Sequence, residues 1–167
     1  MSLNAVQHCR VNSSNRCERK RVTLDERQAF IADALCHPDG IARTFCLTLA
    51  HTRCRISEAL ELNERRIELN AGQLVFRSLK KRDGRVHHRA VPVPPSHLDG
   101  LELVHGVRQA QRRRREIGQR LWTCSRNTAW RRKEVMEMAG IEGPHATPKG
   151  LRHGSGVHAL MKDVPLP

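Results

Sequence analysis

Hydrophobic residues recur every three or four positions through the first third of the chain, which predicts helices. Thr23, with Glu26 three residues later, forms a capping box that starts the first of these helices. Residues 37–40, His-Pro-Asp-Gly, end it, because proline and glycine interrupt helices. The largely apolar residues 41–50 predict a central helix. The apolar positions of the next predicted helix are Ile56, Ala59, Leu60 and Leu62.

The middle of the chain changes to an alternating pattern, which predicts strands. The expected strands cover residues 66–69, 74–77 and 88–91, with residues 70–72 as one turn and residues 80–85 as the next. Asp83-Gly84 is a common pair in tight hairpin turns. The fold class predicted from the pattern is therefore α+β, mainly helical, with a small three-stranded antiparallel sheet on one edge.

Helical spacing returns after the strands. Ser96 is expected to cap a helix through Leu98, Leu101, Leu103, Val104 and Val107 that runs into the basic residues 112–115. Ser125 is expected to cap a helix over residues 126–139, which Gly140 stops. The apolar stripe of that second helix consists of Ala129, Trp130, Val135, Met136 and Met138.

The last predicted helix begins near Thr147, with Thr147 as N-cap and Pro148 in the first turn. Lys149 and Arg152 lie three positions apart on one face of it. Gly154 and Gly156 weaken this helix but permit close approach of another segment.

Length and charge limit the classes of protein to which the chain can belong. The chain has 167 residues, enough for one domain over residues 21–167, and the polar residues 1–20 are expected to form a flexible extension. A net charge of +13 indicates a polyanionic partner. An aromatic content of 3%, with no tyrosine, disfavours recognition of single strands by base stacking. Double-stranded nucleic acid, held through its phosphates, is the better match.

Other classes are disfavoured by composition. No apolar run is long enough to cross a membrane and no signal segment precedes residue 20, so a cytoplasmic location is expected. The six cysteines form no C-x-x-C pair, which predicts reduced thiols that mostly fill the core, such as Cys36 and Cys46. Histidine spacing matches no zinc motif, so neither a metal nor another cofactor is expected.

Two boxes in the sequence resemble those of the tyrosine recombinase family, which includes phage integrases and Xer-type recombinases. Residues 52–60, Thr-Arg-Cys-Arg-Ile-Ser-Glu-Ala-Leu, match the family's first arginine box, and Lys149-Gly-Leu-Arg152-His153 matches the second. The basic hairpin and Val91-Pro92-Val93 between the boxes resemble the family's small sheet. The resemblance covers residues 21–167 and implies the family's DNA breaking-rejoining catalytic core.

The resemblance also implies roles for individual residues. Arg55 and Arg152 would hold the scissile phosphate, and Lys80 would be the general acid on the hairpin, with Lys81 as the alternative. Lys149 would lie near the attacking hydroxyl or the phosphate. Glu58 would orient a guanidinium or favour the helix dipole, and His153 would support the site. Candidate DNA contacts are Arg82, Arg85, Arg126, Arg131 and Arg132.

The sequence departs from the family pattern in several places. The family's nucleophile is a tyrosine, and this chain contains none, so it is expected to be incomplete at its C-terminus and inactive alone. Arg53 stands where the family has glycine, which implies a strained backbone if the position needs a positive φ. Ser155 stands where the family tends to have an apolar residue.

Three functions stay open from the sequence. The first is a fragment of a bacterial, phage-encoded or plasmid-encoded site-specific recombinase or integrase that acts on double-stranded DNA with other recombinase protomers. The second is a non-catalytic DNA-binding remnant of such an integrase. The third is a basic RNA- or ribosome-associated protein, which a preference for structured RNA would indicate.

Overall fold

The computed structural model describes residues 21–78, 87–113, 118–125 and 134–161, without the side chains of residues 155–161. The described helices are α1 (Leu24–Cys36), α2 (Gly40–Thr52), α3 (Ile56–Leu60), α4 (Pro95–His105), α5 (Val107–Arg112), α7 (Glu134–Met138) and α8 (Pro148–Met161), with the short 3-10 helix η1 (Glu64–Arg66). The strands are β1 (Ile67–Glu68), β2 (Gln73–Ser78) and β3 (His87–Pro92). No helix among the described residues is long and apolar enough to cross a membrane.

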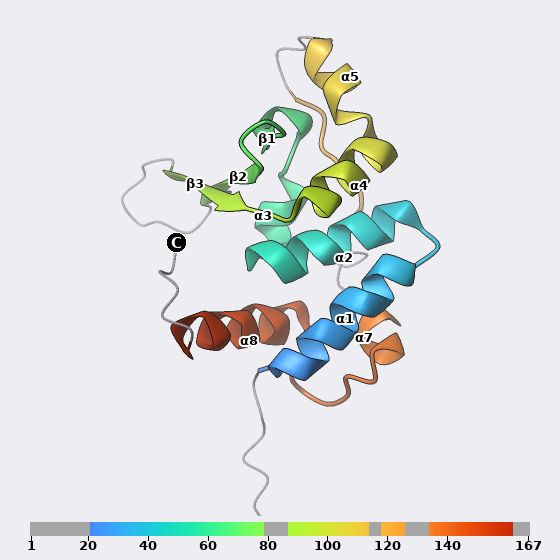
Figure 1. Cartoon of the computed structure of the whole chain (residues 1–167), viewed down its shortest axis with the longest axis vertical. Coiled ribbons are helices and arrows are strands. Elements are labelled where there is room, and N and C mark those ends of the chain that lie inside the picture. Colours follow the sequence, from blue (N-terminus) through green and yellow to red (C-terminus); the bar gives the residue numbers. More distant parts are fainter. Residues whose placement is uncertain (1–20, 79–86, 114–117, 126–133, 162–167) are drawn as a thin grey trace, which may run out of the picture.

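Helix α2 lies at the centre of the molecule, as its apolar sequence predicts. Most of its residues are buried, and α1, α4 and α8 all pack against it (Figure 1). Asp39 caps its first turn through a hydrogen bond from the Ile41 backbone N–H. Gly40 is therefore the first residue of α2 and not part of the break that the sequence predicts.

The sheet is three-stranded and antiparallel in the order β1-β2-β3, as predicted. Leu74 pairs with Val91 and Phe76 pairs with Arg89, so these four side chains share one face of the sheet. Leu74, Phe76 and Val91 are buried, which turns this face toward the core. In Figure 1 the sheet lies above α2 and α8 lies below it, both toward the left of the view.

Helix α1 begins as the sequence predicts. The Thr23 hydroxyl accepts from the Glu26 backbone N–H, and the Glu26 carboxylate accepts from the Thr23 N–H, which completes the capping box. Thr147 likewise accepts from the Gly150 N–H at the start of α8. The predicted N-caps Thr23 and Thr147 are thus confirmed.

The helix after the sheet differs from the prediction. Pro94, and not Ser96, is the N-cap of α4, and Pro95 occupies the first turn. Gly106 adopts a left-handed conformation with φ of 58°, which ends α4 before Val107 and starts α5. The predicted single helix is therefore two helices.

Several residues predicted in apolar stripes are exposed. Leu103 and Met138 are exposed, Leu103 by 81%, and Cys36, which was predicted to fill the core, is exposed as well. Cys46 is buried as predicted. Helical spacing predicts only roughly which face of a helix is apolar. Which residues of that face are buried depends on the elements that pack against it. Ala129 and Trp130 of the same predicted stripe lie outside the described residues.

Candidate phosphate-binding site

Arg55 lies at the N-terminus of α3, where one carboxylate fixes it at two points. The Arg55 backbone N–H donates to Oε2 of Glu58 over 2.8 Å, and Nη1 of Arg55 donates to Oε1 over 2.8 Å. Glu58 is only 3% exposed. The carboxylate therefore binds the backbone at the start of the helix and the guanidinium of the same residue.

Arg89 on β3 reaches the same carboxylate. Its Nη2 lies 3.3 Å from Oε2 of Glu58, and its Nη1 donates to the Thr52 carbonyl over 3.4 Å. The guanidinium also lies 5.3 Å from the centroid of the Phe76 ring, within cation–π range. No role for Arg89 is predicted from the sequence. The feature of the sequence that could have indicated a role is a basic residue in a predicted strand that can pair with the strand of the aromatic Phe76.

Arg152 approaches this group from α8. Burial lowers the pKa of the Arg152 guanidinium, and the nearby positive charges of Arg55 and Arg89 lower it further, while Glu58 acts in the opposite direction. The two boxes of the sequence, about a hundred residues apart, therefore meet at one place, although no hydrogen bond from Arg152 to a described residue is formed. The N–H donors of Arg152 are left for another acceptor.

The charges around Glu58 do not balance. Burial is the largest influence and raises the pKa of Glu58, but hydrogen bonding to Arg55 and the charges of Arg89 and Arg55 together hold it below its usual value. Glu58 is thus ionised at neutral pH. Three guanidinium groups around one carboxylate leave an excess of two positive charges, which favours binding of an anion.

The other predicted site residues are placed as follows. Lys149 and His153 lie on α8 near Arg152, and both are exposed. The hairpin lysines and the predicted DNA contacts fall outside the described residues: Lys80, Lys81, Arg82, Arg85, Arg126, Arg131 and Arg132. The side chain of Ser155 is not described either.

Arg53 adopts the left-handed conformation that its position in the first box implies. With φ of 53°, it is the single residue other than glycine with a positive φ in the described part of the chain. It ends α2 and lies two residues before Arg55. The predicted strain is therefore present, yet Arg55 is held firmly by Glu58.

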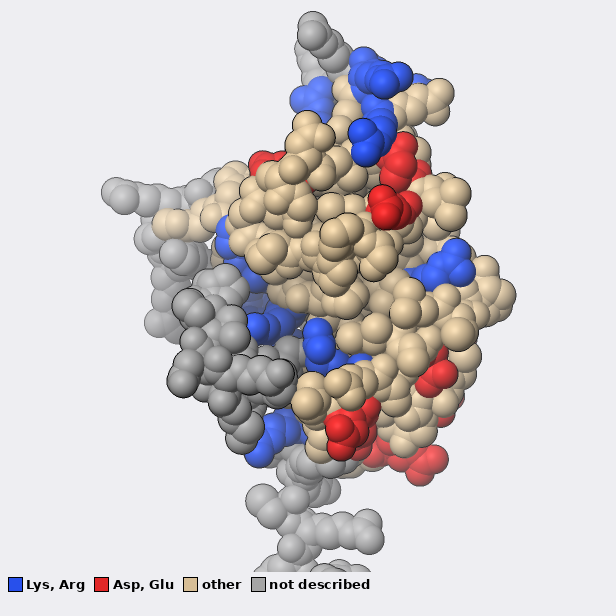
Figure 2. All heavy atoms as spheres, in the orientation of Figure 1, with Lys and Arg blue, Asp and Glu red and all other residues tan. Residues whose placement is uncertain are grey.

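The described residues contain no group of three histidine, cysteine, aspartate or glutamate side chains that could hold a metal ion. Figure 2 shows Lys and Arg side chains between the sheet and α8 and a further group at the top of the same face, with Asp and Glu side chains beside that top group and along the lower part. This distribution suits a polyanion that crosses the arginine cluster.

No family model matches the sequence. The chain is 32% identical over 152 residues to the type 1 fimbriae regulatory protein FimE of Escherichia coli K12, covering 83% of this chain and 71% of FimE, and equally to FimE of Shigella flexneri.

Solved structures show the same fold. The XerA recombinase aligns with a TM-score of 0.68 at 20% identity, over 87% of this chain and 52% of XerA. The XerH site-specific recombinase bound to difH substrate aligns with a TM-score of 0.65 at 16% identity, over 86% of this chain and 43% of XerH. The chain thus spans about half the length of these structures.

A helical core with a three-stranded antiparallel sheet at its edge is the catalytic-domain fold of site-specific recombinases. Within that class, the chain belongs to the tyrosine recombinase family.

Proposed function

We propose that this chain is the phosphate-holding part of a site-specific DNA recombinase or integrase, in which Arg55 and Arg152 bind one phosphodiester of duplex DNA. The observation that carries the proposal is the convergence of Arg55, Arg89 and Arg152 on a single buried carboxylate. XerH, a protein of the same fold, was solved on a DNA substrate, which supports a DNA partner for this chain as well.

The residue types suit transesterification at phosphorus. Attack on a phosphodiester builds negative charge on its non-bridging oxygens, and fixed cations aimed at those oxygens lower the barrier. A guanidinium pairs two oxygens at once and stays charged at any working pH. Glu58 holds Arg55 in place before DNA arrives, so little ordering is needed on binding.

Proton transfer to the leaving 5′ oxygen is assigned to Lys80, with Lys81 as the alternative. Ser78 pairs with His87, so residues 79–86 connect β2 to β3. Two residues further along β3, Arg89 ties the strand to Glu58 and so supports a role for this hairpin at the arginine cluster. Exposed Lys149 on α8 would contribute a further positive charge near the phosphate.

The attacking hydroxyl is not supplied by a tyrosine of this sequence, which contains none. Cys54 lies in the first box, but burial raises the pKa of its thiol to about 12, so it does not provide a thiolate. This favours a second candidate function, a DNA-binding module that holds phosphates without cleaving. In both cases the partners are duplex DNA and other recombinase protomers.

Substitution of Arg152 tests the proposal. Because its guanidinium has no partner among the described side chains, Arg152→Gln should fold normally but bind a 30-base-pair duplex more weakly. In a plot of the logarithm of the binding constant against the logarithm of the salt concentration, the slope should be smaller in magnitude by about 0.9 than for wild type. Exposed Arg108 on α5 is the matched control, and Arg108→Gln should change neither quantity comparably. Fluorescence anisotropy from 50 to 300 mM salt measures both.

Equal slopes for wild type and Arg152→Gln would contradict the proposal. A second experiment uses a chain extended to carry a tyrosine, and it distinguishes DNA cleavage from DNA binding alone. A covalent protein–DNA adduct that disappears in Arg55→Ala supports the recombinase, while salt-dependent binding without any adduct supports the non-catalytic module.

A further inference from the structure

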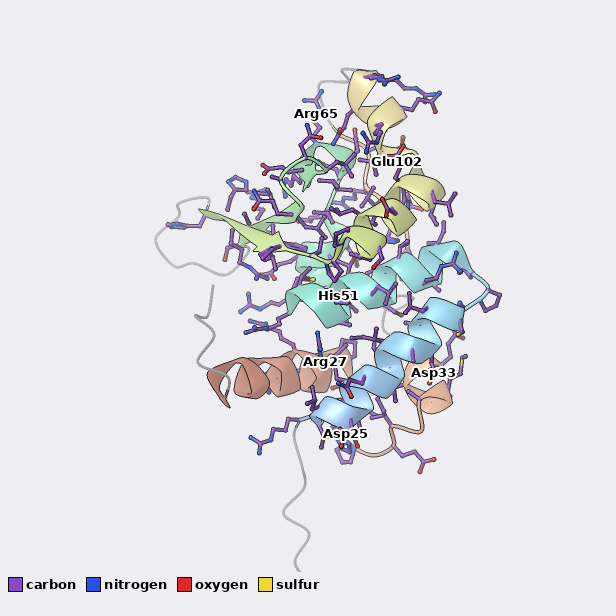
Figure 3. The ribbon with its side chains drawn as sticks, in the orientation of Figure 1. Asp25, Arg27, Asp33, His51, Arg65 and Glu102 are labelled. Carbon is purple, nitrogen blue, oxygen red and sulfur yellow. The ribbon has the colours of Figure 1, made fainter. Side chains whose placement is uncertain are left out.

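A second pair of arginines lies at the C-terminal end of α2, next to the site described above. Arg27 reaches across from α1, and its Nη2 donates to the Ala50 carbonyl over 2.9 Å. Figure 3 shows Arg27 between α1 and the end of α2, where His51 also lies. Arg53 is the C-cap of that same helix. Two residues far apart in sequence therefore bring their guanidinium groups to one helix end.

The Arg27 guanidinium is only partly used by the protein. One of its five N–H groups binds Ala50, and its Nε is buried without a hydrogen-bond partner in the described structure. A buried donor without an acceptor is costly, and native proteins rarely tolerate one without a reason. An arginine that served only to bind the last carbonyls of α2 would not need this arrangement.

No carboxylate among the described residues pairs with either arginine. Burial lowers the pKa of Arg27, and the positive charge of Arg53 lowers it further. Burial and the Arg27 charge also lower the pKa of His51 to about 4, so His51 is neutral at pH 7. The last carbonyls of α2, to which Arg27 donates, offset only part of the repulsion between the two guanidinium groups, and an anion between them would relieve the rest.

The backbone conformation at Arg53 also indicates a functional role for this residue. An L-residue other than glycine, asparagine or aspartate is uncommon at a φ of 53°, and strained residues cluster at functional sites. Glycine would fit this position without strain and would end α2 equally well. The side chain of Arg53 is therefore not needed to form the turn, and its positive charge is the property that remains to be explained.

We propose that Arg27 and Arg53 form a second phosphate-binding site, which takes a backbone phosphate of the same DNA strand close to the one held by Arg55 and Arg152. The inference rests on the proposed function. Arg53 and Arg55 are two residues apart, so their Cα atoms are separated by at most about 7 Å. Phosphates follow one another every 3.4 Å of axis along one strand, a spacing that such a pair can span.

Arg53→Gly is the decisive variant, because it removes the guanidinium and the backbone strain together. We expect its urea midpoint to be unchanged or raised, while the log–log salt slope of duplex binding falls by about 0.9 relative to wild type. Arg53→Lys keeps the charge and should keep most of the slope. A residue with a purely structural role would show the opposite pattern, with stability altered and the slope intact.

Arg27→Gln provides the second measurement and should lower the slope by a similar amount. Its matched control is Arg43→Gln, because Arg43 on α2 also donates to a backbone carbonyl, that of His37, but at the other end of the helix. Arg43→Gln should leave the slope unchanged. Competition by inorganic phosphate, tested separately, distinguishes a site for free phosphate from one that needs a duplex.

The outcomes separate the two proposals. If wild type shows no salt-dependent duplex binding, the proposed function itself fails. If wild type binds and Arg152→Gln lowers the slope while Arg53→Gly and Arg27→Gln keep the full slope, the second phosphate site is wrong and the proposed function stands. Stronger competition by inorganic phosphate than by duplex also overturns the assignment to DNA.

Discussion

At the scale of single residues, Glu58 organises the candidate site. Its two oxygens bind the Arg55 backbone, the Arg55 guanidinium and the Arg89 guanidinium. A buried carboxylate needs such partners, because an unpaired charge in the interior is strongly destabilising. The same contacts that satisfy Glu58 also hold two cations in fixed positions, so stability and anion binding depend on one side chain.

Substitution of Arg89 tests this dependence. Arg89→Met keeps much of the side-chain volume over Phe76 but removes one partner of Glu58, and should lower the free energy of unfolding by about 1–3 kcal/mol. Urea denaturation at pH 7 measures it. Arg77→Met on β2 is the control, since Arg77 is exposed and should change stability by less than about 0.5 kcal/mol. Equal effects of the two substitutions would contradict a special role for Arg89.

At the scale of elements, the contact between α2 and α4 includes two polar pairs, one buried and one partly buried. Thr48 Oγ1 lies 2.9 Å from Nε2 of His97, and Thr44 Oγ1 lies 3.0 Å from Nε2 of His105. The Thr44 hydroxyl also accepts from the Trp122 indole N–H over 3.3 Å. These pairs fix how the two helices lie against each other, in addition to the apolar contacts of Leu98 and Leu101.

The buried histidines predict acid sensitivity. Burial, with a smaller effect from His51, lowers the pKa of His97 to about 3. In the unfolded chain a histidine binds a proton below pH 6.5, whereas folded His97 does not, so its contribution to stability is complete above pH 6.5 and is lost as the pH falls toward 3. Between pH 7 and pH 5 this amounts to about 2 kcal/mol.

Urea denaturation at pH 7 and pH 5 checks this expectation. The difference in unfolding free energy between the two pH values should be about 2 kcal/mol smaller in His97→Gln, whose amide can still bind Thr48 but does not titrate. His88→Gln, at an exposed position of β3, should retain the wild-type difference. An unchanged difference in His97→Gln would show that His97 protonates freely in the folded protein.

At the scale of the whole molecule, two glycines decide where α8 lies. A Cβ atom on Gly154 would lie 2.0 Å from the Val22 carbonyl oxygen, and one on Gly150 would lie 2.0 Å from the His145 carbonyl oxygen. The Val22 N–H also donates to the Gly150 carbonyl over 3.2 Å. Close contact between α8 and the segment before α1 therefore requires glycine, and this contact helps position Arg152 beside Arg55.

Alanine substitutions at two helical glycines test this placement. Gly154→Ala should destabilise the fold by about 1–3 kcal/mol, because the new methyl group meets backbone, and should weaken duplex binding by displacing Arg152. Gly100→Ala on α4 is the matched control. A Cβ there meets nothing within 4 Å, so alanine should stabilise by roughly 0.5–1 kcal/mol through its helix propensity. Destabilisation of the same size in both would refute the close-packing argument.

Local patterns determined much of this protein. The capping box at Thr23, the apolar residues of α2, the alternation in β2 and β3 and the N-cap at Thr147 are all readable from the sequence, because each depends on neighbours a few positions away. Where competing local signals overlapped, as at Ser96 and Gly106, the element boundaries were predicted incorrectly.

Only the tertiary structure decided which arginines lie together. The two boxes predict Arg55 and Arg152 as partners by resemblance, but Arg89, Arg27 and Arg53 enter through contacts between segments 20 to 40 residues apart in sequence. Periodicity assigns a side chain to a face but does not say which charge lies opposite it. Charges interact through space, and the packing of α1, α3 and α8 on α2, with the sheet against α3, sets the distances between them.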